Sequence, residues 1–160
     1  MPFRPAVWAI LLLLPASVAV AEEDEDHVAQ KGDVKVVHAW SRATDADEGV
    51  VFMGIESLGG GDRLTGAESE AAERVEIHGA VLKDGEMASQ PLDAVEIPAG
   101  GEFVLESGAV FLKLLGLKQP LRQGEEFGVE LLFAEAGELD VHVLVEAADA
   151  TQHSHAGHAH

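Results

Sequence analysis

Hydrophobic and polar residues alternate along much of this chain. In residues 138–146, ELDVHVLVE, the apolar side chains occupy every second position and predict one buried face, with His142 and Glu146 on the outer face. Residues 74–81, RVEIHGAV, alternate in the same way, with Ile77 predicted to point inward and His78 outward. A period of two residues is typical of a half-buried β-strand. Both segments are therefore predicted strands.

The rest of the chain from Val34 onward has the same character. Further strand candidates are residues 49–57, 102–106, 109–115 and 127–133, and glycine-containing turn signals separate them. The pattern contains no long amphipathic helix, and the one helical turn that it suggests lies around residues 70–73. Short strands at near-regular spacing predict an all-β domain, an antiparallel β-sandwich or barrel.

Four regions are expected along the chain. Residues 1–21 read as a cleaved signal peptide, with Arg4, an apolar stretch, and small residues at Ala19 and Ala21 before the cleavage point. Residues 22–33 are acidic and predict a loose N-terminal arm. Residues 34–146 form the β-domain, and residues 147–160 a disordered, His-rich tail. The mature protein is therefore expected to be exported, with no membrane span after cleavage.

Composition narrows the possible chemistry. The sequence contains no cysteine, which excludes disulfides, thiolate metal ligands, thiol nucleophiles and attachment of a lipid to a cysteine. Its net charge of −19 disfavours nucleic acid and anionic lipid as partners and favours cations. Motifs of serine hydrolases, zinc peptidases and phosphate-binding loops are absent from the sequence. We therefore predict that the protein is not an enzyme.

Three segments carry a family resemblance: residues 74–121, HAWSRAT at 38–44 and DRLTGAES at 62–69. Together they resemble the periplasmic copper chaperones of the PCuAC family. The resemblance implies a cupredoxin-like antiparallel β-sandwich over residues 34–146, a periplasmic location and copper as the bound ion. It also implies a membrane-bound copper enzyme, such as a respiratory oxidase, as the acceptor of that copper.

The family's copper ligands follow a fixed pattern: His or Met, ten residues, Met, twenty-one residues, His, one residue, Met. Aligned on His78, the pattern places Ser89, Phe111 and Lys113 at the other three positions. Copper(I) prefers thioether and imidazole ligands, so three of the four positions lack a suitable donor. Met87 is a candidate for a displaced thioether ligand, whereas a surface imidazole is the alternative for His78.

The C-terminal tail is the stronger metal signal. Four of its last eight residues are histidines: His153, His155, His158 and His160. Several imidazoles on one short segment can bind a borderline divalent ion, and Cu(II) is favoured by its intrinsic affinity. Cu(II) at the tail is therefore preferred over Cu(I) in the domain. His38 is an additional candidate, with a packed, hydrogen-bonded histidine as the alternative.

Two functions follow from these observations. The first is a periplasmic metallochaperone or copper buffer whose Cu(I) site is mostly lost and whose His-rich tail binds the metal. The alternative is a protein-interaction module without metal, in which an exposed Phe111 beside Lys113 forms part of a contact patch.

Overall fold

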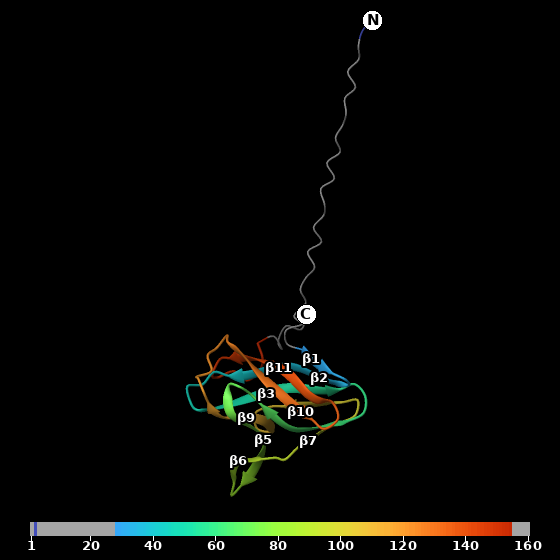
Figure 1. Cartoon of the computed structure of the whole chain (residues 1–160). Coiled ribbons are helices and arrows are strands. Elements are labelled where there is room, and N and C mark those ends of the chain that lie inside the picture. Colours follow the sequence, from blue (N-terminus) through green and yellow to red (C-terminus); the bar gives the residue numbers. More distant parts are fainter. Residues whose placement is uncertain (1, 3–27, 155–160) are drawn as a thin grey trace.

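The computed structural model describes residue 2 and residues 28–154, so the expected signal peptide and the last six residues lie outside its described part. Every regular element in the described part is a β-strand, and Figure 1 shows them wrapped into one rounded body. The strands are β1 (Val28–Lys31), β2 (Val34–Arg42), β3 (Glu48–Ser57), β4 (Asp62–Glu68), β5 (Ala72–Lys83), β6 (Glu86–Pro91), β7 (Val95–Ile97), β8 (Glu102–Leu105), β9 (Val110–Leu117), β10 (Glu126–Phe133) and β11 (Gly137–Glu146).

Seven of these strands close into a ring. Going round it, the order is β2, β11, β10, β4, β5, β9 and β3, and β3 pairs with β2 again. The pair β2–β11 is parallel and the others are antiparallel, so the barrel-like sheet is mixed. Closure leaves the seven strands without a free edge. The all-β prediction is confirmed, but β2 and β11 are parallel where the sequence predicted antiparallel pairing.

The interior is filled by the apolar faces that the alternation predicted. Apolar side chains with no measurable exposure come from five strands: Val51, Ile55, Leu64, Leu112, Leu114, Leu131 and Val143. Each buried side chain of this size contributes roughly 1.5–3 kcal/mol to stability relative to full exposure. The core therefore spans the barrel and fixes its strands in register.

Strand β6 lies outside the ring. It pairs with the far half of β5, and Figure 1 shows this hairpin projecting from the barrel. All six residues of β6 are exposed. The hairpin brings β6 alongside the segment of β5 that contains His78, so the arrangement positions the candidate copper site.

Three local expectations differ from the structure. Residues 28–31 of the expected loose arm form β1, which pairs with β2. The expected helical turn at residues 70–73 is a non-helical turn at residues 70–71, and residues 72–73 already belong to β5. Glu146, expected on the outer face of its strand, is only 8% exposed because the chain beyond it folds back over it.

Within the described residues, no helix is long and apolar enough to cross a membrane.

Candidate metal sites

The strand register brings the family's ligand positions together. His78 on β5 lies opposite Phe111 on β9 on one side and opposite Pro91 on β6 on the other. The Nδ1 atom of His78 is 3.3 Å from Ser89 Oγ, and the His78 ring centroid is 5.9 Å from that of Phe111. Three of the four aligned positions are therefore neighbours in space, as expected of a copper site.

His78 is buried, which makes the surface-imidazole alternative wrong. It is 6% exposed, and the side chains of Glu76, Ser89 and Phe111 lie around its ring. Its Nε2 atom is 2.8 Å from Glu76 Oε2, and since an ionised carboxylate only accepts hydrogen bonds, Nε2–H donates. In the neutral ring Nδ1 then accepts from the Ser89 hydroxyl. Both ring nitrogens are engaged, so a metal ion would have to displace one of these partners.

Glu76 completes this small network. Its other oxygen, Oε1, is 2.7 Å from Arg74 Nε. The hydrogen bond from His78 holds the pKa of Glu76 below its usual value, against the effect of desolvation and with help from the charge of Arg74. The carboxylate is therefore ionised and stabilised by protein partners rather than by a metal.

The fourth aligned position carries a cation. Lys113 on β9 lies opposite Glu76, but its Nζ atom is 3.0 Å from Glu48 Oε2 on the neighbouring strand β3. A positive charge at a metal position repels a copper ion, and the effect is strongest where solvent is partly excluded. Lys113 is only a quarter exposed. This position therefore opposes metal binding.

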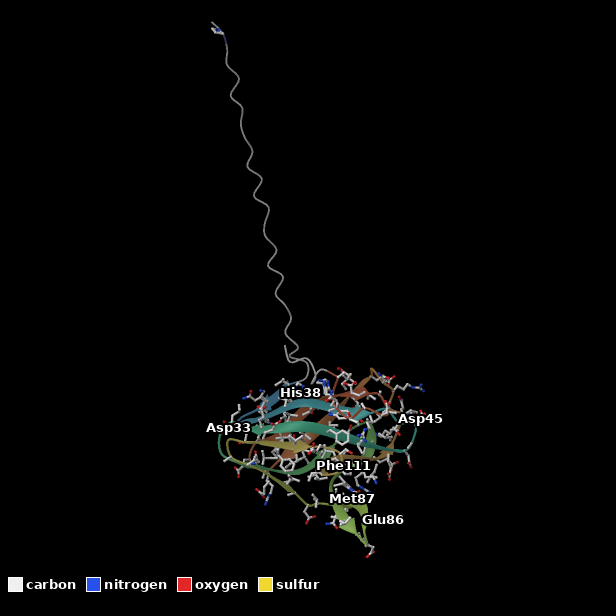
Figure 2. The ribbon with its side chains drawn as sticks, turned by 180° about the vertical axis from the view of Figure 1, so that it is seen from behind. Asp33, His38, Asp45, Glu86, Met87 and Phe111 are labelled. Atoms are coloured by element: carbon white, nitrogen blue, oxygen red, sulfur yellow. The ribbon has the colours of Figure 1, made fainter. Side chains whose placement is uncertain are left out.

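Met87 lies further out on the hairpin. It pairs with Leu82, whereas His78 pairs with Pro91, so four residues separate the two levels along the strand. At about 3.3 Å per residue this is roughly 13 Å. Figure 2 shows Met87 on the projecting hairpin together with Glu86. A site that joined Met87 to His78 would require the hairpin to bend.

The β5–β6 hairpin also carries exposed apolar side chains. Leu82 is 71% exposed and Met87 65% exposed, and they are cross-strand partners. Phe111, which was expected to be exposed, is only partly so because it packs beside His78. A contact patch at this end would therefore consist of Leu82 and Met87 and not of Phe111.

A second group of histidines lies on the other side of the molecule. After β11 the chain turns at residues 147–150 and returns along β2 as a segment that we call the C-terminal strap, residues 147–154. Arg42 Nε donates to the carbonyl oxygen of Ala150 at 2.8 Å and fixes this strap. Arg42 also lies over the rings of Trp40 and Phe52.

The strap places His153 beside His38. His153 is 2% exposed, and its ring centroid is 5.7 Å from that of His38. His38 itself is exposed, so a packed and hydrogen-bonded His38 is not what the structure has. In Figure 2, His38 lies on the side of the barrel opposite Met87. This pairing could not be predicted from the sequence, because the strap lacks any strand pattern.

The remaining tail histidines, His155, His158 and His160, lie outside the described residues. Among the residues that the structure does describe, no group of three or more His, Asp or Glu side chains is arranged to hold a metal ion. His142 is exposed on β11, opposite Gly128.

Comparison with known proteins agrees with this geometry. Residues 34–145 match the model of a family described as "Putative lipoprotein LpqE-like". The chain is 32% identical over 143 residues to "Putative lipoprotein Lxx21020" of Leifsonia xyli subsp. xyli (strain CTCB07), covering 88% of this chain and 86% of that protein. The description as a lipoprotein belongs to that family and that relative.

Solved structures give the same fold. The apo PCuAC domain of PmoF2 is 26% identical, with a TM-score of 0.65 over 79% of this chain and 99% of that one. The Cu(I)-bound DR1885 protein from Deinococcus radiodurans is 22% identical, with a TM-score of 0.54 over 68% of this chain and 75% of that one. The chain therefore belongs to the LpqE-like family and has the fold of PCuAC copper-chaperone domains.

Proposed function

We propose that this protein is an extracytoplasmic copper-binding protein, a metallochaperone or buffer, in which the barrel's Cu(I) site is mostly lost and the His-rich C-terminus binds the metal as Cu(II). The PCuAC domain of PmoF2 and the DR1885 protein share this fold, and both have structures with copper bound. Export through the signal peptide at residues 1–21 to the periplasm is part of the proposal, as is a non-enzymatic role.

One observation carries the proposal. The family's ligand positions are assembled around His78, yet Ser89 and Phe111 supply no good copper donor and Lys113 supplies a positive charge. A domain that retains the site's geometry without its donors is poorly suited to Cu(I). The imidazoles of the C-terminal region are the main donor-rich feature left in the sequence.

The test compares the whole protein with a version that ends at Ser154. This end point removes His155, His158 and His160 but keeps the strap and its contacts, so the barrel is left intact. We expect the whole protein to bind about one Cu(II) ion in a calorimetric titration and the shortened one to bind at least tenfold more weakly. Binding should fade below about pH 6, because imidazoles must lose a proton to ligate.

A Cu(I) chelator competition completes the design. We expect both versions to lose Cu(I) to a strong chelator, because the barrel has too few soft donors. Retention of Cu(I) by the version ending at Ser154, or its undiminished affinity for Cu(II), would move the metal site back into the barrel and contradict the proposal.

The interaction-module alternative has one observation in its favour. Leu82 and Met87 form an exposed apolar pair on the projecting hairpin, next to the aligned ligand positions. The same surface would suit contact with a membrane-bound acceptor such as a respiratory oxidase if the protein does deliver copper. A protein that binds neither Cu(I) nor Cu(II) would favour the alternative.

A further inference from the structure

We infer that His38 and His153 together form a binding site for a borderline divalent ion, Cu(II) or Zn(II), that fastens the C-terminal strap to the barrel. The inference rests on the proposed function, because His153 is the first histidine of the C-terminal cluster. It goes beyond that function by adding a ligand from the barrel. With His38 as a ligand, metal binding by the C-terminal histidines would depend on the folded barrel.

The local backbone aims His38 outward. The β2–β3 register shifts between Val37 and Trp40, which marks a β-bulge, and His38 has a φ of 52°. A bulge redirects a side chain out of the normal alternation. A left-handed conformation at a residue other than glycine costs roughly 1–2 kcal/mol. Such strain is commonly retained at functional positions, so the conformation of His38 is an independent reason to suspect a role.

The distance between the rings fits a shared ion. Zinc–nitrogen bonds are about 2.0–2.1 Å long, so a ring centroid lies roughly 3 Å from the ion, and two rings that share it have centroids within about 6 Å. The centroids of His38 and His153 are 5.7 Å apart and the planes are inclined at 49°. Two imidazoles are also a donor set that Cu(II) and Zn(II) both accept.

The carboxylate of Glu146 lies near the ring of His153. Glu146 Oε1 is 3.9 Å from His153 Nε2 and accepts hydrogen bonds from the backbone N–H and the hydroxyl of Ser154. At 3.9 Å the carboxylate is beyond hydrogen-bond distance of this nitrogen, but its negative charge favours a cation bound by the ring. The Arg42–Ala150 hydrogen bond holds the strap that carries His153. The fold therefore presents this pair before any metal binds.

The test uses His38→Asn in the full chain, with His142→Asn as the matched control. Asparagine tolerates the left-handed conformation, so the barrel should fold normally. His142 is an exposed histidine on β11, the strand that pairs with β2, so this control tests whether any imidazole on this side would serve. Calorimetric titration with Cu(II) and with Zn(II) should show a loss of affinity of about tenfold or more in His38→Asn and none in His142→Asn. Adding Cu(II) should raise the unfolding temperature, Tm, of the unsubstituted protein and raise that of His38→Asn much less. A bound ion stabilises the barrel only if its site requires the folded barrel.

The outcomes separate this inference from the proposed function. Unchanged affinity and an unchanged Cu(II)-induced rise in Tm in His38→Asn would overturn the inference. If the version ending at Ser154 nevertheless binds Cu(II) more weakly than the whole protein, the proposed role of the tail is supported without the His38–His153 site. Conversely, full affinity in the version ending at Ser154, together with a loss in His38→Asn, would support the pair and overturn the proposed role of the tail.

Discussion

At the scale of single residues, identity decides whether a preserved position is a working site. The backbone brings His78, Ser89 and Phe111 together as the family pattern requires. The side chains then satisfy one another: the imidazole is bonded to Glu76, and the lysine at the remaining position to Glu48. Hydrogen bonds and an ion pair occupy the place that the family pattern assigns to copper.

Asp62 is a second residue whose role is defined by its partners. It is 7% exposed and accepts hydrogen bonds from the backbone N–H groups of Arg63, Glu135 and Ala136. Burial alone would raise the pKa of its carboxyl, but the three backbone donors outweigh it and hold the pKa below the usual value. The charge of Asp62 therefore secures the turn between β10 and β11 against the start of β4.

We expect Asp62→Ala to lower the free energy of unfolding by about 3 kcal/mol at pH 7, since three charge-assisted hydrogen bonds are lost. Because its pKa is lowered in the folded state, the stabilisation is complete above the unfolded pKa of about 3.9 and disappears as the pH falls through the folded pKa. Urea denaturation at a series of pH values measures this. The exposed Asp93→Ala is the control, with an effect within about 0.5 kcal/mol; an equal cost in both variants would refute the role.

At the scale of elements, the β5–β6 hairpin and β9 form the scaffold of the family's site. The register sets His78 opposite Phe111 on β9 and opposite Pro91 on β6. Ser89 is two residues from Pro91 on the same strand. These relations depend on backbone pairing and not on the side chains that now occupy them. The scaffold should therefore regain copper binding when its donors are returned.

The combination Ser89→Met, Phe111→His and Lys113→Met should create tight Cu(I) binding at His78. It supplies two thioethers and a second imidazole and removes the positive charge. Glu48 loses its partner but is about half exposed, so the stability cost is small. Competition with a Cu(I) chelator measures the gain. A matched variant with leucine at the same three positions should gain nothing, and a failure of the donor-bearing variant would show that the register does not define a site.

Much of the strand arrangement could be predicted from the sequence. The alternation predicted β3, β5, β8, β9, β10 and β11 to within about two residues, because one face of each strand is buried. The gathering of the aligned positions followed from the family resemblance. The burial of His78 could not be predicted, because alternation does not show which side chains of the neighbouring strands pack around its ring.

Other features depend on contacts that local patterns do not encode. The bulge at His38 breaks the period of two, so the exposure of this residue could not be predicted from Val34 and Val36. The strap is rich in small residues and has no strand pattern, yet it buries Glu146 and His153. Its position is set by long-range bonds such as Arg42 to Ala150.

At the scale of the whole molecule, His38 on β2 and His78 on β5 lie on strands that are not neighbours in the ring: β3 and β9 separate them in one direction and β11, β10 and β4 in the other. His78 and His38 therefore cannot share one ion. The net charge of −19 attracts cations to the whole surface and favours delivery of a metal to either side. We propose that copper binds on the side that carries the strap and its histidines.

X-ray absorption of the copper-loaded protein tests this assignment most directly, because it identifies the atoms bound to the metal. Sulfur is available only from methionine, and beyond the expected signal peptide the chain has Met53, which is buried, and Met87. The account predicts nitrogen and oxygen neighbours with the multiple-scattering signature of imidazole and no sulfur. A sulfur neighbour would place copper at the hairpin beside Met87 and contradict the claim that binding has moved to the C-terminal histidines.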